Sequence, residues 1–237
     1  MTNSNVLFQH GTLALLVPGL LDGTITMKEL LQHGDTGIGT GEGLDGELMI
    51  LDGVPYQTDG TGKVNIVSDD FTLPFANSHF AKYEKLMSVE NISRPDLQST
   101  IISKVKSANT FYSLRIHGTF KNMKARAVRK STKPYQTLAQ TAENQNIFDS
   151  ELIDGTLLSY YSPEVFDGAA VAGFHSHFLA DDHKFGGHIL SFESVTGDVK
   201  FQRFDSLEQH LPTDNKEFME HDFTKDNIIN DIHSAEK

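Results

Sequence analysis

The stretch that decides the fold runs Val171-Ala-Gly-Phe-His-Ser-His-Phe-Leu-Ala-Asp-Asp-His-Lys-Phe-Gly-Gly-His-Ile-Leu-Ser-Phe-Glu193, and it contains four of the eleven histidines. His175 and His177 stand two apart among apolar residues, and residues two apart in a β-strand project from the same face. Residues 179–186 include acidic residues and glycine, which is typical of a turn, and an alternating pattern resumes at Gly187. We therefore predict a β-hairpin, in which a symmetric turn places His188 opposite His177.

Three histidines of this hairpin form a candidate metal site. Directly opposed residues on one face of a hairpin have Cβ atoms about 4.5–5.5 Å apart, so the imidazoles of His175, His177 and His188 could meet at one cation. Three neutral imidazoles suit Zn²⁺, and copper, nickel, iron and cobalt remain open. Such a set leaves a fourth position free, which is typical of a catalytic zinc site and not of a structural one. His183 falls at the turn tip, so we expect a solvated loop residue there and exclude it from the site.

Composition excludes several classes of protein. The 237 residues suffice for one large domain or two small ones, and either can bury a core. Because the chain has no cysteine, disulfides and thiolate ligands are excluded, and a metal must be held by His, Asp or Glu. The net charge of -12 argues against a nucleic-acid partner, since general binding of that kind needs Lys and Arg to neutralise phosphates.

The sequence also argues against a membrane protein. Its longest apolar run, Leu13–Leu21, falls far short of the ~20 residues that a membrane span requires. The first five residues carry no Lys or Arg, so the basic start of a secretion signal is missing. We therefore expect no membrane association and a cytoplasmic location.

Local signals predict several short elements. Thr26-Met-Lys-Glu29 has the form of a capping box that opens a short helix, and Ser93-Arg-Pro-Asp96 opens another with Pro in its first turn. Asp52-Gly53 is typical of a two-residue hairpin turn. Residues 111–120 alternate as a strand, and weaker helical patterns lie near 134–146 and after 217.

Together these elements indicate an α+β fold with mixed β-sheets and a few helices, arranged as two closely packed α/β parts. We place an N-terminal part at 1–140, which carries Glu47 and Arg126. A C-terminal part at 141–237 carries the histidine hairpin. The two parts can also be counted as one domain.

Two further kinds of side chain are candidates for chemistry. Glu47 stands where a glycine-rich loop enters a strand, a position that is usually exposed but can point an acid or a base into a site. The pattern of residues 121–130 predicts a strand rich in Lys and Arg. Side chains charged at this density usually lie on a solvent-exposed face. In a chain this acidic, a local basic patch can instead hold an anionic substrate, which makes Arg126 and Arg129 candidates.

Seven segments together have a specific pattern: Gly11–Leu16, Thr26–Thr40, Leu44–Leu48, Asp52–Gln57, Phe111–Phe120, Ala172–Phe178 and Phe185–His188. On these segments the chain resembles the alpha-acetolactate decarboxylase family, over nearly its whole length. The resemblance implies zinc on His175, His177 and His188, with Glu47, Arg126 and a C-terminal glutamate, for which we choose Glu236, completing the site. It also implies a two-part homodimer that converts (S)-2-acetolactate, a 2-hydroxy-3-oxo acid, to (R)-acetoin and carbon dioxide.

The residues agree with that chemistry. Loss of carbon dioxide from acetolactate leaves an enediolate, whose charge a zinc ion could stabilise as a Lewis acid. Arg126 could pair with the departing carboxylate or with the developing charge. A glutamate must then protonate one face of the enediolate, and we expect Glu47, on an ordered strand, to suit this better than Glu236 near a chain end.

Two other readings stay open. A cupin-like metalloenzyme, an oxygenase or isomerase, also gathers histidines on strands, but it commonly adds a carboxylate ligand soon after the His-x-His pair. A structural zinc hairpin in a binding module would need neither Glu47 nor Arg126.

Overall fold

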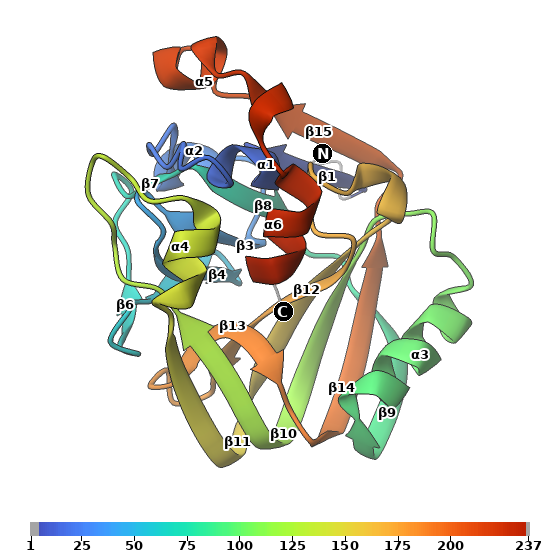
Figure 1. Ribbon diagram of the computed structural model, residues 1–237. Helices are drawn as coiled ribbons and strands as arrows, with labels where there is room; N and C mark the ends of the chain where they lie inside the picture. Colours follow the sequence, from blue (N-terminus) through green and yellow to red (C-terminus); the bar gives the residue numbers. More distant parts are fainter. Residues whose placement is uncertain (1–4, 236–237) are drawn as a thin grey trace.

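The computed structural model describes residues 5–235 and is built on two large β-sheets (Figure 1). The first sheet has the strand order β15-β1-β8-β3-β4-β5-β6. Its strands are β1 (Val6–His10), β3 (Thr36–Gly41), β4 (Asp45–Leu51), β5 (Val54–Thr58), β6 (Val64–Ile66), β8 (Phe75–His79) and β15 (Ser206–His210). Neighbouring strands are antiparallel except for β1 and β15, which run parallel.

The second sheet is antiparallel and has the strand order β11-β12-β13-β10-β14-β9. Its strands are β9 (Glu84–Ser93), β10 (Tyr112–Ala127), β11 (Asn146–Ser162), β12 (Gly173–Ala180), β13 (Gly186–Ser191) and β14 (Ser194–Arg203). Because β11 also pairs with β10, the four strands β11, β12, β13 and β10 close on themselves as a small barrel.

Short helices and one small sheet complete the fold. The α-helices are α1 (Leu13–Leu16), α2 (Met27–Leu30), α3 (Arg94–Val105), α4 (Leu138–Glu143), α5 (Lys216–Glu220) and α6 (Ile228–Ala235). Two 3₁₀ turns, η1 (Glu164–Phe166) and η2 (Phe223–Lys225), and the strand pair β2 (Ile25–Thr26) and β7 (Thr72–Leu73) lie between them. Strands outnumber helices in both length and number over residues 5–235, which confirms the predicted α+β class.

The boundary between the sheets does not fall at one place in the chain. β9 and β10 precede residue 140 yet belong to the second sheet, and β15, close to the C-terminus, belongs to the first. Arg126 therefore shares a sheet with the histidine hairpin. The division into 1–140 and 141–237 stays a prediction about folding units, and it does not coincide with the boundary between the sheets.

The local signals in the sequence correspond to real caps and turns. Thr26 and Glu29 form the predicted capping box of α2, and the Ser93 side chain accepts a hydrogen bond from the Asp96 backbone at the start of α3. Asp52 and Gly53 have φ of 51° and 81°, the left-handed values of a type I′ turn, and join β4 to β5.

Two predicted elements differ in extent. Residues 111–120 and 121–130 were expected as separate strands, but β10 runs unbroken from Tyr112 to Ala127 because both neighbouring strands continue its pairing. The helix expected near 134–146 is shorter: α4 begins after the Thr137 cap and ends at Glu143. Among residues 5–235, no helix is both long enough and apolar enough to cross a membrane.

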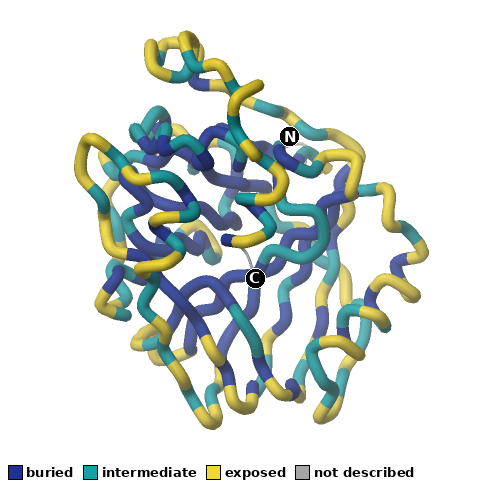
Figure 2. The backbone as a smooth tube through the Cα atoms, in the orientation of Figure 1, coloured by how far each residue is buried: buried dark blue, intermediate teal, exposed yellow. Residues whose placement is uncertain are grey.

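The core between the two sheets combines side chains from both. Ile38 and Met49 of the first sheet meet Leu158 and Leu179 of the second. Figure 2 shows buried backbone along the central strands of both sheets and exposed backbone at their outer turns. The sheets therefore hold each other through an apolar interface, and polar groups inside it must find partners within the protein.

His79 at the end of β8 is such a buried polar group. It is fully buried, its ring packs edge-on against Phe204 with 4.9 Å between ring centroids, and its Nδ1 lies 2.7 Å from the Tyr160 hydroxyl. Burial lowers the pKa of His79 to about 3. The folded protein therefore keeps this imidazole neutral at pH values where an unfolded chain would protonate it.

This gives a signed prediction for acid stability. Below the ordinary histidine pKa of 6.5, His79 binds a proton in the unfolded chain but stays neutral in the folded protein. The free energy of unfolding therefore falls as the pH falls toward about 3. His79 alone should contribute a loss of about 2 kcal/mol between pH 7 and pH 5. Urea unfolding of the His79→Phe variant at the two pH values should show a drop smaller by that amount. His183→Phe, changed at an exposed histidine, is the control, and an equal drop in all three proteins would contradict the assignment.

Candidate active site

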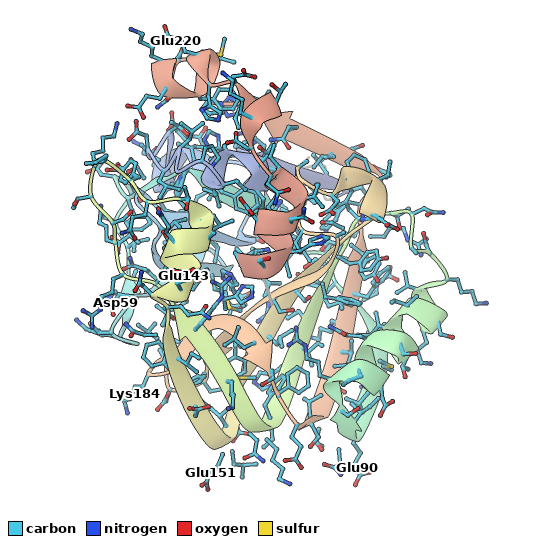
Figure 3. The ribbon with its side chains drawn as sticks, in the orientation of Figure 1. Asp59, Glu90, Glu143, Glu151, Lys184 and Glu220 are labelled. Atoms are coloured by element: carbon cyan, nitrogen blue, oxygen red, sulfur yellow. The ribbon has the colours of Figure 1, made fainter. Side chains whose placement is uncertain are left out.

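The histidine hairpin has the predicted register. β12 and β13 pair antiparallel, and His177 stands directly opposite His188. Residues 181–185 form the turn between them, and exposed His183 lies there with a φ of 55°. Figure 3 shows Lys184, the next residue, at the outer tip of the hairpin, away from α4 with its labelled Glu143. The structure therefore separates His183 from the other three histidines, as predicted.

The other three histidines converge. One ring nitrogen of each of His175, His177 and His188 lies within 4.8 Å of the others. Ring centroids are 5.3 Å apart for His175 and His177, 5.0 Å for His175 and His188, and 5.6 Å for His177 and His188. The three side chains could hold one metal ion.

The charge state of this cluster also suits a metal. Burial, together with the charge of Arg126, lowers the pKa of His175 to about 3, and the same two causes hold the pKa of His188 well below its ordinary value. Both imidazoles are therefore neutral at neutral pH, and a neutral imidazole has the lone pair that a metal ion needs. The donor set fits zinc and similar divalent ions.

His177 is oriented from the opposite sheet. Its Nδ1 lies 2.7 Å from the backbone oxygen of Leu48, so Nδ1 carries the proton and donates it. This tautomer directs the lone pair of Nε2 into the cluster. A backbone carbonyl that fixes a histidine in this way is typical of metal sites, because it sets both the tautomer and the ring orientation.

Glu47 lies beside the same ring. It is 9% exposed, and its Oε2 is 3.3 Å from Nε2 of His177. The predicted alternative of an exposed loop residue is wrong for Glu47, because β4 turns its side chain toward the second sheet.

Arg126 reaches the cluster from β10, where it is the cross-strand neighbour of His188. It is only 5% exposed. Arg129, the other candidate, is exposed and follows the end of β10, where it packs against Gly60. The structure thus brings one of the two candidate arginines to the histidines and leaves the other at the surface.

A pocket joins Glu47 and Arg126 to the histidine cluster. Its polar side is lined by Glu47, Arg126, His175 and His177. Its other side is apolar and includes Leu13 and Leu16 of α1, Leu44, Phe75, Val128 and Leu138. A concave, mostly apolar cavity with a few convergent polar groups is the usual form of a small-molecule site.

The apolar wall was not predicted. Leu13 and Leu16 were noted only as part of an apolar run, and α4 only as a weak helix, because nothing in either segment marks it as facing a site. α6 contacts both α1 and α4, and its Ile232 is fully buried in the same apolar cluster (Figure 1). The C-terminal helix therefore supports the pocket wall. Glu236, predicted to complete the site, lies outside the described residues.

The chain is similar to one family of known proteins over most of its length. Residues 7–225 match the family model for alpha-acetolactate decarboxylase. The chain is 36% identical over 237 residues to alpha-acetolactate decarboxylase of Lactococcus lactis subsp. cremoris, and 37% identical over 241 residues to that of Streptococcus thermophilus, with complete coverage of both chains in each case.

Solved structures of similar proteins have the same fold as this chain. Alpha-acetolactate decarboxylase of Bacillus subtilis strain 168 superposes with a TM-score of 0.94 at 29% identity, covering 98% of this chain and 99% of that one. A Staphylococcus aureus protein described as similar to alpha-acetolactate decarboxylase superposes with a TM-score of 0.93 at 36% identity, covering 98% and 100%. Fold and sequence thus define a carboxy-lyase. The chain belongs to the alpha-acetolactate decarboxylase family.

The geometry of the cluster predicts which histidines bind metal. His177→Ala should weaken zinc binding at least about a hundredfold, since it removes one of the three ligands, the one whose ring is oriented by the Leu48 carbonyl. His183→Ala, a matched change in the same hairpin, should leave zinc affinity within about twofold, since nothing couples its exposed ring to the cluster. Isothermal titration of the metal-free proteins measures both. Equal zinc affinity in His177→Ala and the unchanged protein would refute the site.

Proposed function

We propose that this protein decarboxylates (S)-2-acetolactate to (R)-acetoin and carbon dioxide, with Zn²⁺ held by His175, His177 and His188. The observation that carries the proposal is that a three-imidazole donor set lies beside a buried glutamate and a buried arginine, with the glutamate, the arginine, His175 and His177 lining one pocket. Membership of the decarboxylase family supplies the substrate class. A structural zinc site would require neither the glutamate nor the arginine beside it.

The substrate carries one negative charge and two small alkyl groups, and the pocket has a counterpart for each. Arg126 offers a planar guanidinium that can bind a carboxylate through two parallel hydrogen bonds. The side chains of Leu13, Leu16 and Leu138 offer an apolar surface for the methyl groups. Substrate is thereby held with its carboxylate toward β10 and its carbon skeleton toward α1 and α4.

When bound, the zinc ion supplies a Lewis acid that stabilises negative charge developing on the hydroxyl and ketone oxygens of the substrate. The reaction itself breaks the bond between C2 and the carboxyl carbon. The electron pair of that bond moves into the carbon skeleton, carbon dioxide leaves, and an enediolate remains. Because product formation requires a proton on C2 of that enediolate, a proton donor must lie on one face of the pocket.

Glu47 is our candidate for that donor. Its carboxyl group is buried, and its Oε2 lies 3.3 Å from Nε2 of His177. β4 holds it in the pocket wall, so it would deliver the proton to one face of a planar enediolate. Glu236 is proposed to complete the site as a second acid. A homodimer and a cytoplasmic location are also proposed, on the family resemblance and on the sequence.

The role of Arg126 can be tested with a substitution that keeps its charge. Arg126→Lys loses the planar fork, so kcat/KM for acetolactate should fall at least about tenfold. The melting temperature should change much less than activity does. Arg129→Lys is the matched control on the exposed side of the same segment. If kcat/KM of Arg126→Lys equals that of the unchanged protein, the proposed role of Arg126 in substrate binding is wrong.

The role of Glu47 can be tested while zinc stays bound. Glu47→Gln keeps the shape but loses the transferable proton, so acetoin formation should fall roughly 10²–10⁴-fold at equal zinc occupancy. Acetoin yield and enantiomeric excess are measured by chiral chromatography after incubation with racemic acetolactate. A variant lacking residues 236 and 237 is compared in parallel. If it gives racemic acetoin or none, while Glu47→Gln gives one enantiomer at a near-normal rate, then Glu236 is the donor. If the unchanged protein with zinc bound makes no acetoin from acetolactate, the proposed function is wrong.

A further inference from the structure

The strand β13 contains a β-bulge just after the histidine that it contributes to the cluster. Ile189 and Ser191 pair with consecutive residues of β10, so Leu190 between them is left over as an extra residue. On its other side, β13 pairs with β12 only as far as His188. Within residues 5–235, Leu190 therefore has no Cα partner on either neighbouring strand. A bulge of this kind interrupts the hydrogen-bond ladder and changes the direction of the side chains next to it.

The bulge decides which way the side chains of β13 point. Ile189 and Phe192 stand three residues apart, a spacing that puts two residues on opposite faces of a regular strand. Both are nevertheless buried in the apolar cluster that packs against α3. The extra residue between them accounts for this. Because Ile189 points toward α3, His188 projects from the opposite face, toward the other two histidines, and stands beside its β10 neighbour Arg126.

Arg94, the first residue of α3, holds the bulge. Its Nη1 donates a hydrogen bond to the backbone oxygen of Leu190, 96 positions further along the chain. A hydrogen bond from a charged donor is roughly twice as strong as one between neutral groups. The guanidinium thus supplies a strong donor to a carbonyl of the residue that the strand pairing skips. α3 packs beside β9 in the second sheet, so this bond ties β13 to the opposite edge of its own sheet (Figure 1).

The backbone of Arg94 is itself fixed. Ser93, the residue before it, ends β9 and pairs with Ser194 of β14. The Ser93 side chain also caps the first turn of α3. Arg94 is half-buried and lies close to the cluster. Burial, Arg126 and the other two histidines lower the pKa of His188 most, and the positive charge of Arg94 adds to their effect.

We propose that Arg94 is a positioning residue of the metal site. By holding the carbonyl of Leu190 it fixes the bulge of β13, and the bulge fixes the direction of the His188 imidazole. Arg94 does not line the catalytic pocket, so it acts through the strand and touches neither substrate nor metal. This inference rests on the proposed function, because it takes His188 as a ligand of the zinc ion.

The first test measures metal binding directly. Arg94→Met removes the donor and keeps a long side chain for packing. Its zinc affinity, from isothermal titration of the metal-free protein, should fall about tenfold, as when a group that orients a metal ligand is lost. The visible absorption of bound Co²⁺, which reports the geometry around the ion, should also change. Removal of a positive charge alone would instead strengthen cation binding. Unchanged or higher zinc affinity, or a Co²⁺ spectrum identical to that of the unchanged protein, would overturn the proposal.

Arg203 offers a matched control. Its Nη2 donates to the backbone oxygen of Val105, at the other end of α3, with a length of 2.9 Å. Arg203 pairs with Tyr112 at the start of β10, whereas Arg126 lies near the end of that strand. Arg203→Met therefore removes the same kind of bond away from the histidines, and it should leave zinc affinity within about twofold. If Arg203→Met weakens zinc binding as much as Arg94→Met does, the effect is one of general stability and the proposal is wrong.

A third variant tests the hydrogen bond against side-chain packing. Arg94→Lys keeps a charged donor, and since one hydrogen bond joins this residue to Leu190, it should bring zinc affinity to within about threefold of the unchanged protein. A lysine variant that binds zinc as weakly as Arg94→Met would contradict the proposal. The unchanged protein separates the two levels of inference. If it binds no zinc, the proposed metal site fails. If it binds zinc and Arg94→Met binds zinc equally well, only the role of Arg94 fails.

Discussion

One hydrogen bond joins the two halves of the site. The imidazole of His177, on β12 of the second sheet, donates to the carbonyl of Leu48, on β4 of the first. That single contact fixes the tautomer of a proposed metal ligand and brings Glu47, the residue before Leu48, to 3.3 Å from the same ring. The position of the proposed acid is therefore set by the packing of two sheets, and any change that shifts one sheet against the other moves acid and imidazole apart.

The features that the sequence predicted are those that short-range rules determine. The period of two along a strand placed His175 and His177 on one face, and the length of the turn placed His188 opposite His177. Capping and turn residues at Thr26, Ser93 and Asp52 have local mechanisms, and all three are found as expected. Hairpin geometry thus sufficed to assemble the three-histidine cluster.

The remaining features depend on contacts between distant parts of the chain. No pattern in Leu13–Leu16 indicates that α1 faces the site, since an apolar run looks the same whether it lines a pocket or fills a core. The sequence also could not show that the Leu48 carbonyl accepts the hydrogen bond of His177. Every residue has a backbone carbonyl, and the packing of the two sheets decides which one lies beside His177. The direct pairing of Arg126 with His188 is a feature of this kind, because it depends on which strands of the second sheet become neighbours.

The parallel pair of β1 and β15 has a consequence for protein synthesis. Gln9 and Gln209 are hydrogen-bonded across 200 residues of chain, and β1 lies between β15 and β8. The pairing of β1 with β15 therefore cannot form until the chain has been synthesised for a further 200 residues. α6, which packs against two helices of the candidate pocket wall, is synthesised later still. A chain that lacks α6 would contain the histidine hairpin, but it would leave the apolar cluster around α1 and α4 uncovered, and exposed apolar surface favours aggregation.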